Sequence, residues 1–292
     1  MTMIDSSPRF LNLPPRFCDP PAARYAILPV PYEGTVSYKG GTAEGPAAII
    51  DASRQVECFD EELRREFIAP GIATYPAVEP AKTPQATLKR VLAAATALVR
   101  KNKFLLTLGG EHSITSALVQ AVMTKHKRLS VLQIDAHADL RDRYRGTAWS
   151  HGAVMRRVLE MTDRLCQVGI RSWSAQENRQ CAAQVENFIT PAIIHQDPNW
   201  IERALGLLGE KVYVTIDIDG LDPAYAPGTG TPEPGGINWH DVTALLRRVC
   251  TQRQVVAADI VEVSPIPHLH ATEYLAARLA YKIIAYTQLR NA

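Results

Sequence analysis

The sequence lacks any arrangement of cysteines that could build a structural framework. Its five cysteines are an odd number, lie scattered through 292 residues and form no CxxC pair. This pattern excludes a disulfide scaffold and a thiolate zinc site, and it indicates reduced thiols. Apolar runs of membrane-spanning length are also missing, and residues 1–21 carry prolines and Asp5 where a signal peptide needs a basic start and an apolar core. We therefore expect a cytoplasmic protein without a membrane partner.

An excess of charge of either sign is missing as well. The 32 basic and 30 acidic residues leave a formal net charge of +2, which is too small to attract nucleic acid or an anionic membrane. No Gly/Ser run, charge block or low-complexity stretch divides the chain, and 46% of its residues are hydrophobic. We expect one domain over residues 1–292, with residues 1–24 as an extended N-terminal segment, and no nucleic-acid partner.

The sequence does contain a regular alternation of short apolar runs and segments of helical spacing. The apolar runs predict buried strands at Tyr25–Val30, Phe104–Leu108, Leu129–Ile134, Leu165–Val168, Ala192–Ile194, Val212–Ile216 and Val255–Val261. The helical spacing predicts helices over Thr87–Val99, Ile114–Val122, Ala153–Leu159, Asp241–Val249 and Ala271–Ala285. Because continuous apolar strands need cover on both faces, the alternation predicts an α/β fold, a three-layer α/β/α sandwich around a mostly parallel central sheet. Ligand sites in such sheets lie beyond the carboxyl ends of the strands.

The first candidate segment at such a strand end is Leu108–Ser113. Here an apolar strand runs into two glycines and then into a helix, for which Ser113 is the expected N-cap. The glycines would let His112 approach the site closely. A single histidine in this setting is by itself more often structural than a ligand, so the assignment of His112 depends on partners elsewhere.

The second segment follows the strand Leu129–Ile134 and supplies those partners. A period of two would place Asp135, His137 and Asp139 on one face, with small alanines between them as an inward-facing array of ligands requires. The alternative is a polar loop whose aspartates form turns.

The third segment follows Val212–Ile216 and adds the carboxylates of Asp217 and Asp219. Aspartates at the ends of buried strands would repel one another and lose their hydration unless a cation lay among them. The alternative is a set of surface aspartates paired with Lys or Arg, but neither this run nor the second segment contains such a basic partner.

The three segments together predict a metal centre. Oxygen and imidazole donors without thiolate favour a hard cation such as Mn²⁺ over a structural zinc ion. Six donors suit two metal ions roughly 3.5 Å apart, between which two aspartates bridge and a water becomes a hydroxide nucleophile near neutral pH. The six expected ligands are His112, Asp135, His137, Asp139, Asp217 and Asp219.

The same segments carry a family resemblance. GGEHS, DAHAD and the run from Thr215 to Gly236 resemble the three signatures of the arginase, agmatinase and formiminoglutamase family, and Pro31–Pro46 resembles its N-terminal segment. The resemblance covers most of residues 25–288. It implies two Mn²⁺ ions per subunit and a homo-oligomer, either a trimer or a hexamer. It also implies one metal held by His112, Asp135, Asp139 and Asp217, and a second held by Asp135, His137, Asp217 and Asp219.

Two catalytic roles follow from the resemblance, and a third, for Asp139, is a hypothesis about the mechanism. Glu262, after the strand Val255–Val261, matches the glutamate that binds the guanidinium group, and a planar cation suits a carboxylate. A surface salt bridge is the alternative for this residue. His151 matches a proton-shuttling histidine, although a lone histidine near a helix start is structural about as often as not. Asp139 is expected to pass the proton of the hydroxide to the departing amine.

The loop Leu140–Trp149 bears on the substrate. It lacks the Asn/Thr/Ser-rich pattern with which arginases hold an α-amino acid, so arginine is disfavoured, whereas its DLRD start and the run Ala226–Gly236 look more like agmatinases. The expected reaction is therefore the hydrolysis of agmatine, a small-molecule guanidino substrate, to putrescine and urea. Ile266–His270 departs from the pattern of many agmatinase relatives, which have a Tyr-Asp pair there, and its histidines are interpreted as surface residues.

Other functions stay open at this point. Aminopropylagmatine, guanidinobutyrate or another guanidino compound could be cut by the same metal centre. A single-zinc deacetylase on a related fold would use fewer of the acidic ligands. A catalytically silent binding protein would keep the fold without the reaction.

Overall fold

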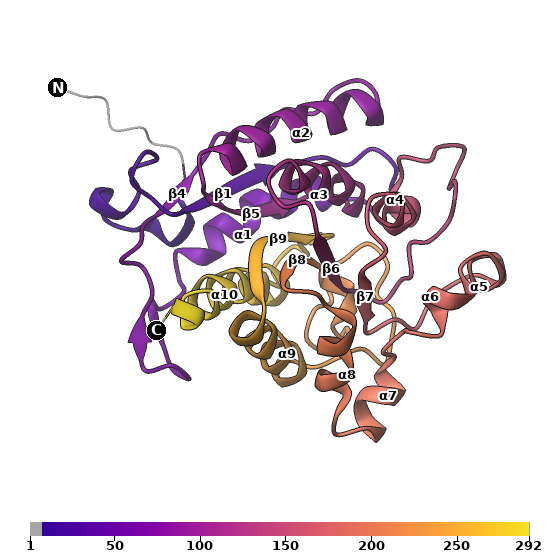
Figure 1. Cartoon of the computed structure of the whole chain (residues 1–292). Coiled ribbons are helices and arrows are strands. Elements are labelled where there is room, and N and C mark those ends of the chain that lie inside the picture. The colour runs from indigo at the N-terminus through magenta and orange to yellow at the C-terminus, as the bar shows by residue number, and fades with distance from the viewer. Residues whose placement is uncertain (1–7, 292) are drawn as a thin grey trace.

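The computed structural model of the chain describes residues 8–291 (Figure 1). The first seven residues of the expected N-terminal segment lie outside this range. Residues 8–24 are not extended throughout, because they contain two single 3-10 turns, η1 (Phe10–Asn12) and η2 (Pro15–Phe17). Phe10 is fully buried, so this segment packs onto the core.

A seven-stranded sheet forms the centre of the molecule, and all its neighbouring strands pair in parallel. Their order across the sheet is β4-β1-β5-β9-β8-β6-β7. The strands are β1 (Tyr25–Val30), β4 (Ile72–Thr74), β5 (Phe104–Gly109), β6 (Leu129–Ile134), β7 (Leu165–Val168), β8 (Lys211–Asp217) and β9 (Gln254–Val261).

Six of the seven apolar runs expected as strands are confirmed. The expectation for Ala192–Ile194 is wrong, because this run lies in the helix α7 (Pro191–Gln196). Thr190 caps that helix by accepting a hydrogen bond from the Ile193 N–H, and Pro191 occupies its first turn. A run of three apolar residues is too short for periodicity to separate strand from helix, whereas the cap and the proline do separate them.

Ten α-helices among the described residues surround the sheet. The five expected helices correspond to α2 (Pro84–Arg100), α3 (Thr115–Met123), α4 (Val154–Leu159), α9 (Trp239–Gln252) and α10 (Ala271–Tyr286). The others are α1 (Gly45–Ser53), α5 (Ala175–Gln180), α6 (Ala182–Val185), α7 and α8 (Trp200–Leu207). These five have nine residues or fewer, and the apolar spacing of the sequence did not predict them.

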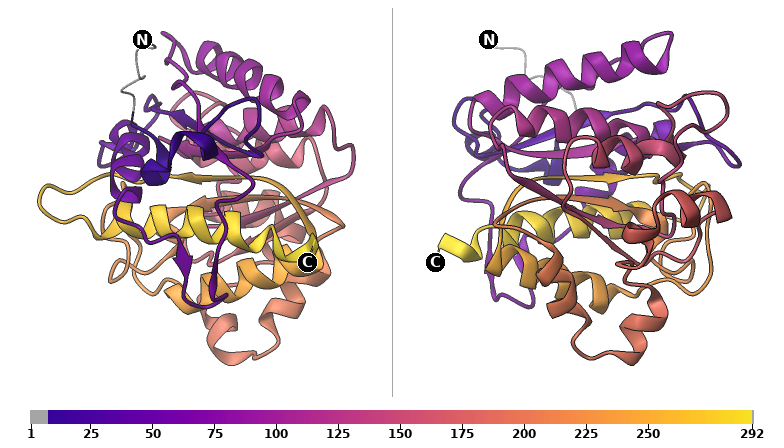
Figure 2. Two further views of the ribbon diagram at one scale, coloured as in Figure 1. Left: turned by 90° about the vertical axis from the view of Figure 1, so that its left-hand side faces the viewer. Right: turned by 45° about the vertical axis from the view of Figure 1, so that its right-hand side comes forward.

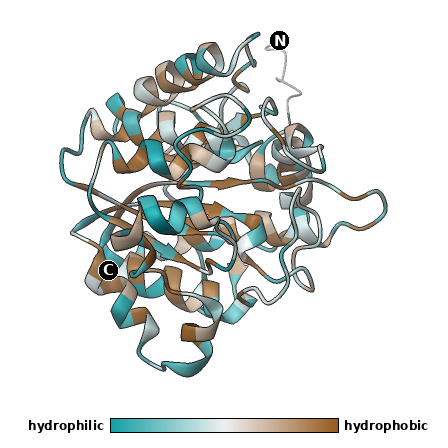
Figure 3. Cartoon of the chain, turned by 90° about the vertical axis from the view of Figure 1, so that its right-hand side faces the viewer, coloured by the Kyte–Doolittle hydropathy of each residue, from teal (hydrophilic) through white to brown (hydrophobic). Residues whose placement is uncertain are grey.

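The helices form two layers, one on each face of the sheet (Figures 1 and 2). One hydrophobic core packs α1, α8, α9 and α10 against side chains such as Tyr25 and Ile27 of β1. The other packs α2, α3 and α4 against the alternate residues Ala26 and Leu28. Hydrophobic residues accordingly concentrate on the strands, between helices whose outer faces are hydrophilic (Figure 3). The expected three-layer α/β/α sandwich is confirmed, and no helix within residues 8–291 is long and apolar enough to cross a membrane.

A buried lysine joins the small hairpin of β2 (Phe59–Asp60) and β3 (Arg65–Glu66) to helix α10. Lys282 is 1% exposed, and its Nζ lies 2.9 Å from Asp60 Oδ2 and 3.0 Å from Glu61 Oε1. Asp60 is itself fully buried, so the charges of Lys282 and Asp60 compensate each other away from water.

Lys282→Met is expected to destabilise the protein by about 3–5 kcal/mol, because it leaves the carboxylate of Asp60 buried without a cation. Urea-induced unfolding measures this loss. Arg278→Met is the matched control on the same helix, since Arg278 pairs with the exposed Glu61, and its cost should stay within about 1 kcal/mol. Equal losses in the two variants would contradict the prediction.

Candidate metal centre

The candidate site lies at the carboxyl ends of four adjacent strands. In the order β5-β9-β8-β6, these strands lead into His112, Glu262, Asp217 and Asp135 respectively. Parallel pairing brings all four strand ends to one edge of the sheet. A cavity of about 270 Å³ opens there, and its lining includes His112, His137, Asp139, His151, Asp217, Asp219 and Glu262.

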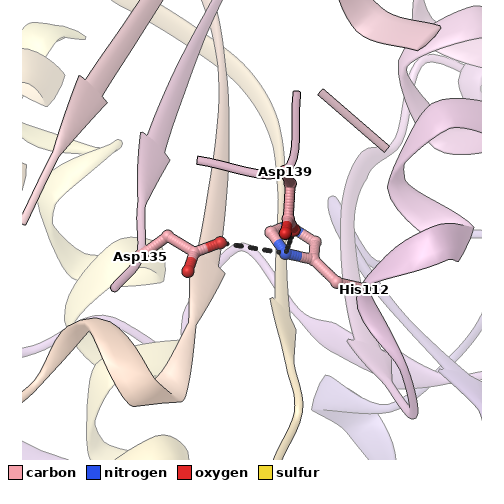
Figure 4. Close-up of side chains that lie close together, drawn as sticks. All are labelled: His112, Asp135 and Asp139. Carbon is pink, nitrogen blue, oxygen red and sulfur yellow. Dashed lines mark ion pairs between the residues drawn. The ribbon is translucent and has the colours of Figure 1, made fainter. Parts of the chain in front are cut away.

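His112 lies at the centre of the first group of donors. Its Nδ1 is 3.1 Å from Asp135 Oδ2, 3.3 Å from Asp139 Oδ2 and 3.3 Å from Asp217 Oδ2. Figure 4 shows how the side chains of His112, Asp135 and Asp139 point toward one another. Nδ1 is buried and makes no hydrogen bond of acceptable geometry, although three carboxylate oxygens surround it.

These separations fit a metal ion better than an ion pair. Neighbouring ligands of an octahedral cation with bonds of about 2.1–2.2 Å lie about 3 Å apart, which matches the spacing around His112. An imidazole nitrogen without a hydrogen-bond partner can direct its lone pair at such a cation. The residues present therefore fit a metal on this side of the site.

A second group of possible ligands shares one residue with the first. His137 Nδ1 lies 3.0 Å from Asp219 Oδ2 and 3.7 Å from Asp135 Oδ1. Asp135 therefore contributes one oxygen to each group, and the two groups, His112-Asp135-Asp139 and Asp135-His137-Asp219, each bring their ligand atoms within 4.8 Å. The structure thus brings together all six residues that the sequence nominated.

The electrostatics of the cluster also favour bound cations. Burial, followed by the charges of Asp219 and Asp135, raises the pKa of Asp217 well above its usual range. Burial and the charge of Asp135 raise the pKa of Asp139 to about 7. Carboxylates that resist ionisation in this way become stable anions when divalent cations lie between them.

The local geometry differs from the sequence expectations in three details. The strand alternation expected for Asp135–Asp139 is wrong, because β6 ends at Ile134 and a turn brings Asp139 to the site with φ of +54°. Ser113 is not the N-cap, since Glu111 precedes the 3-10 turn η4 (His112–Ile114) and Ser113 Oγ donates to its carboxylate. Gly110 is needed for the backbone of Tyr32, whose oxygen would lie 2.0 Å from a Cβ there.

Glu111 holds a loop over the site. Its carboxylate is fully buried and accepts hydrogen bonds from the Gly34 N–H at 2.7 Å and the Thr35 N–H at 2.6 Å. The Thr35 hydroxyl also donates to Glu111 at 2.8 Å and lies 3.2 Å from His151 Nδ1. The hydroxyl proton of Thr35 goes to Glu111, so the Thr35 oxygen can only accept a hydrogen bond from His151. Nδ1 of His151 therefore carries the ring proton, and Nε2 is free to act as a base.

Burial is the main cause that lowers the pKa of His151 to about 4. Its imidazole is therefore neutral at physiological pH, as a proton acceptor must be.

The pH dependence of stability should report this shift. In the unfolded chain His151 titrates near pH 6.5, so as pH falls from about 6.5 toward 4 only the unfolded state takes up the proton, and stability is lost. His151→Asn should remove this part of the loss, on the order of 1–2 kcal/mol at pH 5. Urea unfolding of both metal-free proteins at pH 8 and pH 5 measures it. If the two proteins differ in stability by the same amount at pH 8 and at pH 5, the prediction is contradicted.

Glu262 comes from the end of β9 and is 8% exposed. Its Oε1 accepts a hydrogen bond from the His112 backbone N–H at 2.7 Å, and its backbone has φ of +61°, a conformation that non-glycine residues rarely adopt. No ion pair within residues 8–291 includes Glu262, so the alternative of a surface salt bridge is wrong. The carboxylate is held at the cavity by β9 and by the turn that contains His112.

The comparison with known proteins agrees with this geometry. The model of the arginase family matches residues 23–285. The chain belongs to the arginase family. As a member of it, the chain is a hydrolase that acts on amidino C–N bonds.

Three relatives show how far the similarity extends. The chain is 35% identical to the N(1)-aminopropylagmatine ureohydrolase of Synechocystis sp., and the match covers 97% of each chain. It is 32% identical to the agmatinase of Bacillus cereus, over 90% of this chain and 91% of that one. The structure of the agmatine ureohydrolase of Thermoplasma volcanium superposes with a TM-score of 0.86 at 32% identity, over 93% and 92% of the two chains.

The loop Ile266–His270 forms a tight turn. Ile266 and Leu269 make an antiparallel bridge, and His268 has φ of +66°. His270 Nδ1 lies 2.7 Å from Glu273 Oε1, and the side chain is 78% exposed. Neither histidine joins a metal-binding group among the described residues, and both are exposed, as the sequence predicted.

The sequence analysis did not identify several residues that contact the proposed ligands or the loops that carry them. Asp259 is fully buried in the middle of β9, and Thr215 is fully buried in β8. Arg171 donates to the backbone oxygens of Asp219 and Glu233 and so fixes the loops that carry them. A signal for Asp259 was present, because a carboxylate inside an otherwise apolar strand requires buried partners.

Proposed function

We propose that this chain is a dimanganese ureohydrolase that releases urea from a guanidinoalkylamine, either agmatine or its N1-aminopropyl derivative. The observation that carries the proposal is the environment of His112 Nδ1, a buried nitrogen without a hydrogen bond among the oxygens of three carboxylates. Oxygen-rich donor sets of this kind suit Mn²⁺.

The division of the ligands follows the two groups and, for Asp217, the family resemblance. One Mn²⁺ ion is assigned to His112, Asp135, Asp139 and Asp217, and the other to Asp135, His137, Asp217 and Asp219. Asp135 contributes an oxygen to each group, which supports a bridging role. Asp217 Oδ2 lies 3.3 Å from His112 Nδ1, and the family resemblance makes Asp217 the second candidate to bridge.

A bound pair of cations supplies hydroxide near neutral pH by lowering the pKa of water. The protein's own groups orient the substrate and move the protons. Glu262 keeps one oxygen on the His112 N–H and can offer the other to the planar guanidinium of the substrate. Asp139 lines the cavity and is placed to accept a proton and pass it to the departing amine. His151 Nε2, left free by the Thr35 contact at Nδ1, exchanges that proton with solvent.

The relatives narrow the substrate class. Three relatives named as aminopropylagmatine ureohydrolases are 35–36% identical to this chain, and four relatives named as agmatinases are 31–32% identical. This difference makes N1-aminopropylagmatine the first substrate to test, and agmatine the second. Both share the guanidinoalkylamine end that Glu262 would hold.

A urea-release assay with Mn²⁺-loaded enzyme tests the proposal across N1-aminopropylagmatine, agmatine, guanidinobutyrate and arginine. We expect the highest kcat/KM for one of the first two compounds and about two Mn²⁺ ions per chain. One tightly bound zinc ion and no urea would favour a deacetylase-like enzyme. Full Mn²⁺ loading without urea from any guanidine would favour a binding protein.

A further inference from the structure

A series of buried hydrogen bonds runs from the first metal-ligand group into the sheet. His112 Nε2 lies 2.9 Å from Thr215 Oγ1, and Thr215 Oγ1 donates to Asp259 Oδ1 at 2.6 Å. All three residues are fully buried. The single hydroxyl proton of Thr215 is committed to the carboxylate, so Thr215 can only accept from His112. His112 therefore carries its proton on Nε2 and keeps the lone pair on Nδ1, the atom that faces the carboxylates.

Among the described residues, Asp259 has only hydroxyl partners. Besides Thr215, Tyr213 donates to Asp259 Oδ2 at 2.5 Å and Thr115 donates to the same oxygen at 2.9 Å. No ion pair within the described residues includes Asp259, and burial is the main cause that raises the pKa of its carboxyl. Of the three hydroxyls, only that of Thr215 also contacts His112, so Thr215 connects the carboxylate to the metal site.

We propose that Asp259 and Thr215 are positioning residues that fix the Nε2–H tautomer of His112 and aim its Nδ1 lone pair at the metal. The inference rests on the assignment of His112 as a ligand in the proposed function. A carboxylate that acts through a hydroxyl on the far side of a ligating imidazole fixes the orientation of the ring and raises the basicity of the ligating nitrogen. A polar cluster that serves only the core would affect folding and leave metal affinity unchanged.

Thr215→Val tests the proposal, because it removes the acceptor for His112 Nε2 and keeps the shape of the side chain. We expect the dissociation constant of one of the two Mn²⁺ sites to rise by about 10–100-fold, the usual effect of losing such a partner. Titration of the metal-free protein with Mn²⁺, followed by the electron paramagnetic resonance of free Mn²⁺, measures the constant. Thr215→Ser keeps the hydroxyl and should restore it to within a few-fold of the wild type.

Thr115→Val is the matched control. It removes one hydroxyl donor from the same carboxylate but no direct contact with His112, so it should lower stability and leave the Mn²⁺ constants unchanged. Asp259→Asn is the second variant if Thr215→Val does not fold, and it should also weaken one site.

Two results would overturn the inference. The first is wild-type affinity in a folded Thr215→Val or Asp259→Asn protein, and the second is an equal loss of affinity in Thr115→Val. A wild-type protein that binds no Mn²⁺ would instead overturn the proposed function itself, so the two failures are distinguishable.

Discussion

Asp135→Asn is expected to abolish urea release and to remove most of the bound Mn²⁺. Asp135 is fully buried, and it is the residue that both ligand groups share. Its oxygens already accept hydrogen bonds from Gln133 Nε2 and the His137 N–H, each at 2.6 Å, so the carboxylate is held in one orientation. The substitution removes one negative charge and turns one donor atom into an N–H₂ group that cannot ligate a cation.

The size of this effect follows from the role of the metals. Loss of several kcal/mol of transition-state stabilisation corresponds to a fall in kcat/KM of at least about 1,000-fold. Steady-state kinetics with saturating Mn²⁺ and metal analysis of the dialysed protein measure the two losses. Asp142→Asn is the matched control, since Asp142 is close in sequence but exposed and paired with Arg157. An Asp135→Asn protein with two bound ions and normal activity would refute the proposed centre.

Glu262→Gln should impair the reaction without emptying the metal site. The amide oxygen of glutamine can still accept the bond from the His112 N–H, which keeps the turn in place. What is lost is the negative charge that pairs with the guanidinium. Breaking a buried charge pair costs roughly 2–5 kcal/mol, and we expect kcat/KM to fall by about 100–1,000-fold.

The signature of this variant separates it from Asp135→Asn. It should bind two Mn²⁺ ions with wild-type affinity, show a raised KM and lose turnover because the guanidinium carbon is no longer oriented. Glu160→Gln is the matched control, because Glu160 is exposed and pairs with Arg157 away from the metal-binding residues. Loss of metal in Glu262→Gln, or kinetics like those of the wild type, would contradict the assigned role.

The sequence predicts the site as far as it predicts where the strands end, because the candidate ligands directly follow apolar runs. The runs that end at Ile134 and Ile216 are apolar without a break, and the acidic residues that follow them stand out because no Lys or Arg is interleaved. The expected periodicity of two was nevertheless wrong for Asp135–Asp139. The three side chains still meet, since the turn with a positive φ at Asp139 achieves what a straight strand would not.

By itself the sequence determined the layered α/β class and the six residues that could hold metal ions, because these depend on local patterns of apolar and acidic side chains. Only the tertiary structure decided that β9 lies between β5 and β8, which brings Glu262 to His112 and Asp259 to Thr215. It also decided that Glu111 holds the Thr35 loop against His151. Such contacts join residues about 40 to 150 positions apart, and their energies depend on strand order and burial, which no local pattern of residues encodes.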